Sequence, residues 1–239
     1  MSRAVAFAYA GARAQAHYGQ LLSEGQWERL ERAPDFALFV QTARDTALRP
    51  WVANLDRGTP VHAIEASLRA QFRLCVRAVA HWAPAAWRPA LRWIESLPDL
   101  PAAFYLFSGL EAHPWIAADP LLRRLSARAG LSRRDPASVL VHAWEDGRAL
   151  APAWLEHWHS LWPEPEPALE HLLRLAQDTL QKASREEASL TAVHLEPALR
   201  RAYRKDARAP AGLVAYLALS WLQLLRLRGA LLLRRLELT

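Results

Sequence analysis

The sequence predicts an all-α fold, a multi-helical bundle of short antiparallel helices, on three observations. Hydrophobic residues make up 52% of the 239 residues, and most of them are Ala and Leu. Glycine is scarce, and Val, Ile and Thr rarely occur in runs. Apolar residues recur at intervals of three and four, which is the spacing of one helix face. Because Ala and Leu favour helices and β-branched residues favour strands, we expect helices throughout.

The first helix is expected to carry Tyr9 and Arg13 one turn apart and to end at Leu21-Leu22. The segment that follows fits a capping box, in which Ser23 caps the next helix and Gln26 reaches back to it. Two small helices are predicted after this cap, one around Trp27 and Leu30 and one from Phe36 to Val40.

A longer helix is predicted to start at Gly58-Thr59-Pro60, with Thr59 as its cap and Pro60 in its first position, and to reach Trp82. One of its faces has the spacing of a helix packed on a neighbour, and the opposite face is charged and is expected to pair within itself in water. The apolar face carries Val61, Ile64, Leu68, Phe72, Cys75 and Val79, and the charged face carries Glu65, Arg69 and Arg73.

Prolines divide the middle of the chain into short helices. Asp119-Pro120 and Asp135-Pro136 indicate helix starts, whereas Gly130 and Asp146-Gly147 indicate helix ends. A further helix is expected to carry Trp154, Trp158 and Trp162, which are spaced by four residues.

The segment 163–167 alternates proline with glutamate and predicts an extended linker. It suggests an N-terminal helical region, 1–162, and a C-terminal helical region, 168–239, unless both belong to one continuous domain. The C-terminal region is expected to hold a long helix from 168 to about 206, kinked before Pro197, and a final helix from Pro210 almost to the end. The apolar run Leu213–Leu225 in that final helix would span about 20 Å, less than a ~30 Å hydrocarbon core, which predicts a buried core helix.

The net charge of +6 comes almost entirely from arginine, since Lys182 and Lys205 are the only lysines. An arginine excess suits acidic partners, but these arginines are scattered among carboxylates, which favours a solvated surface. Cys75 is the only cysteine and lies in an apolar segment, so we expect a buried thiol and no intramolecular disulfide. The N-terminus lacks the pattern of a signal peptide, and a cytoplasmic location is expected.

No pattern of residues predicts catalysis. Glu156, His157, Glu170 and His171 lie on either side of the linker and could meet at a metal ion, but no His-Glu-x-x-His motif is present. Nucleophile-elbow, phosphate-loop and dinucleotide motifs are also missing. We therefore expect no catalytic residue, no metal ligand and no cofactor, and no enzymatic activity of the chain itself.

The candidate interface residues are arginines and tryptophans. The helical spacing of the tryptophans favours core packing, although an exposed part of such a row could anchor a partner. Arginines around Gly130 suggest a helix-turn-helix, yet the following segment 137–141 is apolar and predicted to be core, so nucleic acid is not expected as a partner. The candidates are Arg123, Arg124, Arg128, Trp154 and Trp158.

Both ends of the chain resemble the C-type coupling subunits of prokaryotic V-type/A-type rotary ATPases, whose eukaryotic relatives are the d-type subunits. Leu224-Leu225 stands where that family usually has a glutamate, and the chain is considerably shorter than usual members. The N-terminal match consists of Tyr9, Ala12-Arg13 and Leu21-Leu22, then more loosely Leu38, Thr42–Thr46, Pro50 and Leu55, then Ile64-Glu65 and Leu68. The C-terminal match consists of Pro210, Tyr216, Leu217, Leu227-Arg228 and Gly229.

The resemblance implies a non-catalytic coupling protein that sits on the ring of membrane rotor subunits and receives the central shaft of the soluble head. Its partners would be other rotary ATPase subunits, and its place would be the cytoplasm, peripheral to the inner face of the cell membrane. The family's body is a funnel of three similar helical units, of which one would be trimmed or all abbreviated here. The alternatives are a soluble helical adaptor that binds protein or nucleic acid through Trp and Arg surfaces, and an enzyme with a helical pocket.

Overall fold

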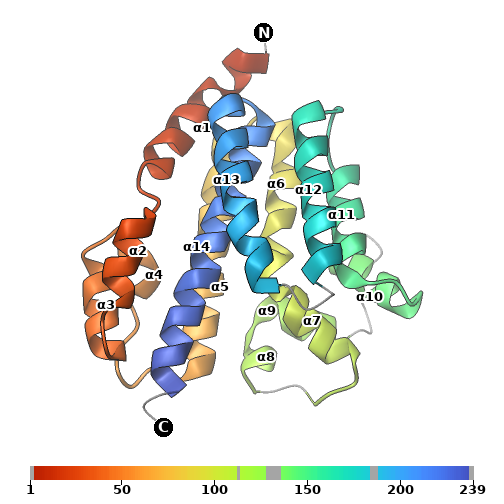
Figure 1. Ribbon diagram of the computed structural model, residues 1–239. Coiled ribbons are helices and arrows are strands. Elements are labelled where there is room, and N and C mark those ends of the chain that lie inside the picture. Colours follow the sequence, from red (N-terminus) through yellow and green to blue (C-terminus); the bar gives the residue numbers. More distant parts are fainter. Residues whose placement is uncertain (1–2, 112–113, 128–135, 184–187, 237–239) are drawn as a thin grey trace. The chain divides into compact units, whose positions relative to one another are not determined.

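The computed structural model describes residues 3–111, 114–127, 136–183 and 188–236. Every regular element in these ranges is a helix, which confirms the all-α prediction (Figure 1). The chain forms two compact units: unit 1 is Met1–Cys75 with Glu196–Thr239, and unit 2 is Val76–Leu195. Helix α5 contributes its first part to unit 1 and its last part to unit 2.

Unit 1 is built around its longest helix, α14. Every residue of α14 from Pro210 to Leu217 is buried, and the helix packs on α1 and α3. In the described part of the chain α14 is the one helix long and apolar enough to cross a membrane, and 67% of that apolar stretch is buried inside the protein. The helices of unit 1 are α1 (Arg3–Tyr18), α2 (Glu24–Glu31), α3 (Phe36–Arg44), α4 (Arg49–Val52), the first part of α5 (Val61–Trp82), the end of α13 (Ala188–Asp206) and α14 (Pro210–Leu236).

Local signals place the starts of α2, α3, α5 and α14 correctly to within a residue, whereas the short helix α4 was not predicted. The predicted capping box is confirmed, because the Ser23 N–H donates to Gln26 Oε1 at 2.8 Å. Two details differ from expectation. Helix α1 ends at Tyr18, before Leu21-Leu22, and a turn follows it. Helix α5 begins at Val61, and the Thr59 hydroxyl donates to Asp56 Oδ1.

The apolar face of α5 is buried as predicted except at Val61, which is 40% exposed, and Cys75, which is half-buried; its charged face is not in water. Ile64, Leu68 and Phe72 are fully buried. On the opposite face Arg69 is only 6% exposed, and Glu65 accepts a hydrogen bond from Arg228 Nε of α14 at 2.6 Å. The prediction of a solvated charged face is therefore wrong, since neighbouring elements cover it.

Unit 2 consists of short helices whose ends follow the predicted proline, aspartate and glycine signals. Asp119 Oδ1 accepts from the Leu122 N–H at 3.2 Å, as a helix cap does, and Gly147 has a positive φ of 69° after α10. Gly130 and Asp135 lie outside the described residues. The helical elements are η1 (Ala85–Trp87), α6 (Arg88–Trp93), η2 (Ile94–Asp99), α7 (Leu100–Phe107), α8 (Pro114–Ala118), α9 (Pro120–Ala127), α10 (Pro136–Glu145), α11 (Leu150–Ser160) and α12 (Pro167–Ala183).

The proline-rich segment 163–167 lies inside unit 2 and connects α11 to α12, which pack on each other. The division into units therefore differs from the expected regions 1–162 and 168–239. The segment runs directly into α12, because Glu166 is buried and its carbonyl accepts from the Glu170 N–H at 2.9 Å. The long helical pattern from 168 to 206 forms two elements, α12 and α13, and Pro197 lies within α13.

Candidate functional site

A row of polar side chains on α14 binds the segment that leads into α2. Gln223 is the first of them. Its side-chain amide donates to the Leu22 carbonyl at 2.9 Å and accepts from the Leu22 N–H at 3.2 Å. Gln223 and Leu22 are 201 residues apart in sequence. Because α1 has already ended, this amide satisfies backbone groups that have no helical partner.

Arg226, one turn further along α14, holds two carboxylates at once. Its guanidinium donates to both oxygens of Glu31 at 2.7 and 2.9 Å and to both oxygens of Glu24 at 2.6 and 2.8 Å. It also lies 4.9 Å from the centroid of the Trp27 ring. The hydrogen bond from Arg226 lowers the pKa of Glu24, and the hydrogen bonds to Glu31 and Glu24 raise the pKa of Arg226. We call this group, Arg226 with Glu24, Glu31 and Trp27, the Arg226 clasp.

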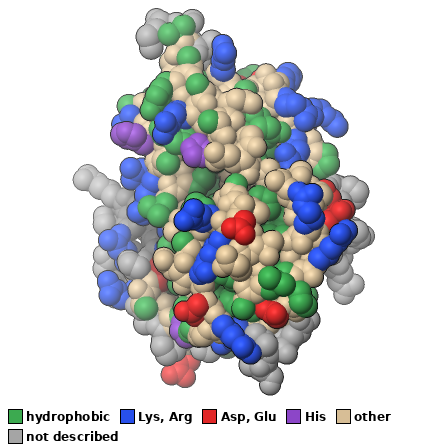
Figure 2. Space-filling view, turned by 90° about the vertical axis from the view of Figure 1, so that its left-hand side faces the viewer, with side chains coloured by type: hydrophobic (Ala, Val, Ile, Leu, Met, Phe, Trp, Pro, Cys, Tyr) green, Lys and Arg blue, Asp and Glu red, His purple; other side chains and the backbone are tan. Residues whose placement is uncertain are grey.

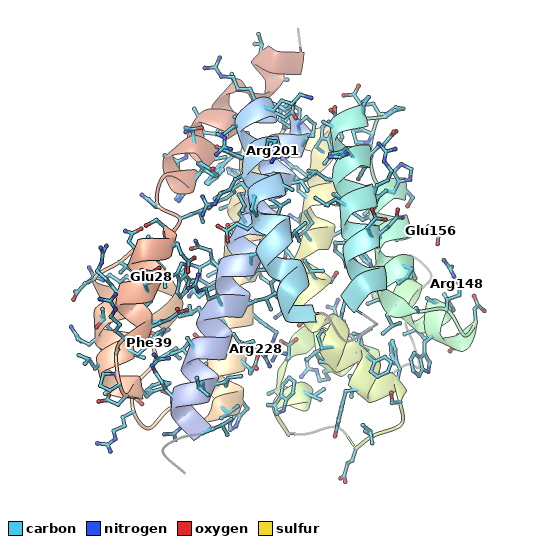
Figure 3. The ribbon with its side chains drawn as sticks, in the orientation of Figure 1. Glu28, Phe39, Arg148, Glu156, Arg201 and Arg228 are labelled. Atoms are coloured by element: carbon cyan, nitrogen blue, oxygen red, sulfur yellow. The ribbon has the colours of Figure 1, made fainter. Side chains whose placement is uncertain are left out.

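Arg234 completes the row from a buried position. It is 8% exposed, and it donates to the Glu31 carbonyl at 2.6 Å and to the Ala33 carbonyl at 2.9 Å. Its guanidinium lies 4.5 Å from the centroid of the Phe39 ring, whose place on α3 is labelled in Figure 3. Since the last carbonyls of a helix have no partner within it, Arg234 caps the end of α2. The polar row thus fastens α2 and α3 to α14.

The Arg226 clasp should make the stability of unit 1 sensitive to acid. A carboxylate whose pKa is lowered by folding adds stability above its unfolded pKa, and this stability is lost as the pH falls through the folded value. We therefore expect the urea midpoint to fall as the pH drops below 4.5, the ordinary value for Glu24. Arg226→Met should remove about 1 kcal/mol of stability at neutral pH, the size expected of a surface ion-pair network, and should flatten the acid dependence.

Circular dichroism in urea at a series of pH values measures both effects. The matched control is Arg228→Met on the same helix, which removes the ion pair with Glu65 but leaves the Arg226 clasp in place. Parallel pH profiles for wild type and Arg226→Met would contradict the prediction.

Unit 1 also has an open pocket of about 630 Å³ beside α3. Three of its polar side chains hold local structure. Asp35 accepts from the Leu38 N–H at 2.9 Å and so caps α3, and Arg44 donates to the Leu55 carbonyl at 2.7 Å. Asp56 accepts from the Gly58 N–H at 2.8 Å. These side chains fix the turns around α3 and α4, and they do not form a catalytic constellation with one another.

The tryptophans of α11 are core residues of unit 2. Trp154 and Trp158 are each 4% exposed, and their rings stack with centroids 6.2 Å apart. Trp154 Nε1–H donates to Ser96 Oγ at 2.8 Å, and Trp158 Nε1–H donates to the Ala90 carbonyl at 3.1 Å. Trp162 follows the end of α11 and packs edge-on against Trp158. The favoured expectation of core packing thus describes this row.

The candidate interface residues do not share one exposed surface in the described part of the chain. Arg123 and Arg124 are exposed on α9, whereas Trp154 and Trp158 are buried in α11. Arg128 lies outside the described residues. Of the segment 137–141 that was expected to be core, Ser138, Leu140 and Val141 are buried in α10.

Two of the four residues weighed as metal ligands, Glu156 and His157, have other partners. Glu156 accepts a hydrogen bond from Arg148, and Figure 3 labels both side chains. His157 packs edge-on against Trp93 with ring centroids 4.5 Å apart, and burial lowers its pKa. Among the residues with described positions, no three His, Cys, Asp or Glu side chains form a group that could hold an ion.

No protein-family model matches the chain, and neither a curated protein nor a solved structure matches it. Membership of the rotary ATPase coupling family therefore stays a prediction from the residues quoted above. The structure adds the location of those residues. The N-terminal match lies in α1 to α5 and the C-terminal match in α14, and both belong to unit 1. Spacing in the sequence gives no signal for their contact.

Proposed function

We propose that this chain is a non-catalytic coupling subunit of a V/A-type rotary ATPase, linking the central shaft of the soluble head to the membrane rotor ring. The observation that carries the proposal is the meeting of the two family-like ends in unit 1. Gln223 and Arg226, which lie between the matching residues of α14, bind Leu22, the last residue of the first N-terminal match, and Glu24, just after it. Two degenerate matches that fold together support a common origin more than either match alone.

A protein that transmits torque must resist bending and twisting, and this chain has suitable internal bracing. In unit 1 the side chains of α14 reach across to backbone and carboxylate groups of α2. In unit 2 indole N–H groups tie α11 to the segment 90–96. Close-packed aromatic seams with satisfied polar groups deform little, which suits a mechanical link.

The proposed location is the cytoplasm, at the inner face of the cell membrane, with attachment through the rotor ring. The net charge of +6 would attract acidic loops of the ring and anionic lipid head groups, mainly by steering the approach. The chain would not hydrolyse ATP itself. Its removal would be expected to uncouple head and ring.

Affinity purification from native membranes tests this proposal. A tagged chain expressed at its natural level should recover shaft, ring and stator subunits of a rotary ATPase after mild detergent extraction, as identified by mass spectrometry. The Gly229→Ala variant serves as a control for substitution in α14, because an added Cβ there meets open space and the variant should fold and recover the same subunits. Recovery of the tagged chain without any of these ATPase components would overturn the proposal. The adaptor alternative lacks the Trp surface it was based on, since Trp154 and Trp158 are buried.

A further inference from the structure

Helix α1 exposes a row of apolar residues opposite its buried face, with Arg13 and Gln15 as exposed polar residues beside them. Phe7, Ala10 and Ala14 are buried in unit 1, as in an ordinary packed helix. On the opposite side Val5 is 58% and Tyr9 61% exposed. A surface helix normally presents mainly polar side chains to water, so a continuous row of exposed apolar residues is unusual. We call the exposed residues Val5, Ala8, Tyr9, Ala12 and Ala16 the α1 stripe.

A group of cations lies at the end of α13, where Tyr203 stacks on Tyr18 of α1. Arg201, Arg204 and Lys205 are exposed near the end of α13, and Arg208 is exposed in the turn that follows. We call these four residues the basic rim. No carboxylate among the described residues lies within ion-pair distance of any of the four. The rim therefore carries positive charge that the described part of the chain does not neutralise by pairing.

Contacts of α1 with the end of α13 and the turn after it place Arg208, one residue of the rim, beside α1. The Tyr18 and Tyr203 rings stack at 4.0 Å, and a Cβ added at Gly11 would lie 3.2 Å from Arg208 Cγ. The two helices thus run antiparallel, with Arg208 at the level of Gly11. At 3.6 residues per turn, Ala8 lies about 60° and Ala12 about 100° around the helix from Gly11. These two residues of the stripe are therefore close to the side of α1 that Arg208 contacts.

The views of unit 1 agree with this arrangement. In Figure 2, which faces the α1 side of unit 1, hydrophobic side chains lie in the upper part with Lys and Arg side chains near them, and acidic side chains are seen only further down. Figure 3 labels Arg201 toward the upper, C-terminal end of α13.

We propose that the α1 stripe and the basic rim form a docking surface for an acidic amphipathic helix of a partner protein. The apolar face of that helix would cover Val5, Tyr9 and the alanines, and its Asp or Glu residues would face the rim. This inference goes beyond the coupling function and does not depend on it, because it rests only on the exposure and charge of unit 1.

The shape of the stripe favours a helix over a lipid surface as its occupant. Ala8, Ala12 and Ala16 recur every four residues and leave a flat track on which a second helix backbone can approach closely. The same alanines would gain little from entering a bilayer, since the gain is about 0.8 kcal/mol for each buried CH₂ group. The positive rim then selects a helix with carboxylates along one edge.

Site-specific photo-crosslinking in the cells that encode the chain tests the proposal. A benzophenone amino acid at Ala12 should form an adduct with a segment that mass spectrometry identifies as an acidic amphipathic helix of another protein. The same probe at Glu28, an exposed position on α2 labelled in Figure 3, should not give that adduct. Raising the salt concentration should lower the adduct yield at Ala12, because the rim acts through exposed charges.

Charge reversal separates the rim from a general effect of net charge. The triple variant Arg204→Glu, Lys205→Glu and Arg208→Glu should lower the adduct yield by about tenfold, the scale of several exposed charge pairs. The matched triple variant Arg29→Glu, Arg32→Glu and Arg49→Glu changes net charge equally at exposed positions elsewhere in unit 1 and should leave the yield unchanged. Circular dichroism checks that both variants fold, and the salt series on the wild-type sequence decides if either does not.

Several results would overturn the docking surface. The first is the lack of any adduct at Ala12. The second is an adduct with the wrong occupant, which would be lipid, a second copy, the same chain or a segment lacking carboxylates. The third is an adduct yield that neither added salt nor charge reversal of the rim changes. An acidic helix from a protein outside any rotary ATPase would support the docking surface while contradicting the proposed coupling function. The two proposals can thus fail separately.

Discussion

Replacing Gly212 by alanine is expected to lower the free energy of unfolding of unit 1 by about 3 kcal/mol, the upper range for overpacking a core. Gly212 lies in the first turn of α14. A Cβ added there would stand 2.2 Å from the Asp206 carbonyl oxygen and 2.8 Å from Ala207 Cα. These are backbone atoms of the turn between α13 and α14, so no flexible side chain can move aside. The turn itself would have to shift.

Gly229→Ala on the same helix is the matched control. Nothing lies within 4 Å of a Cβ added at Gly229, which is exposed. Because alanine favours a helix interior over glycine by about 0.8–1.0 kcal/mol, this variant should be stabilised. The same mutation is thus expected to have opposite signs at two positions of one helix.

Urea unfolding followed by circular dichroism measures both free energies. Hydrogen exchange of the α1 and α14 amides shows whether the change belongs to unit 1. Equal stability of Gly212→Ala and wild type would mean that the α13–α14 turn does not approach α14 as closely as described.

The same turn explains why glycine occurs on the inner side of α1. A Cβ added at Gly11 would lie 2.7 Å from the Ala207 carbonyl oxygen. The backbone at Ala207 therefore approaches both α1 and α14 at glycines. This close approach positions the end of α13, and with it Arg208 of the basic rim, beside α1.

Much of the fold was predictable because its signals are local. The capping box of Ser23 and Gln26, the run of α5 to Trp82 and the extent of α14 depend on neighbours a few residues apart. Helix type and approximate ends follow from such spacing alone.

The rest depends on partners far away in sequence. Arg69 looks solvated within α5, and only the elements packed over it make it buried. Arg226 and Arg234 look like ordinary surface arginines of a C-terminal helix, whereas their partners are in and just after α2. The exposed face of α1 was hidden for the opposite reason: its alanines look like core residues, and only the structure leaves them uncovered.

Replacing Trp158 by alanine is expected to destabilise unit 2 by about 3–5 kcal/mol, the cost of truncating a buried tryptophan. Trp158 is fully packed in α11, and its indole N–H donates to the Ala90 carbonyl at 3.1 Å. Trp158→Phe keeps a ring but leaves that carbonyl without this donor, so it should still cost about 1–3 kcal/mol.

Trp162→Phe is the matched control, because the buried Nε1 of Trp162 has no hydrogen-bond partner among the described residues and its loss gives up no such bond. Urea unfolding, with hydrogen exchange of the α11 amides, compares the three variants. If Trp158→Phe and Trp162→Phe were equally stable, the bond to Ala90 would contribute nothing, and the tie between α11 and α6 would rest on ring packing alone.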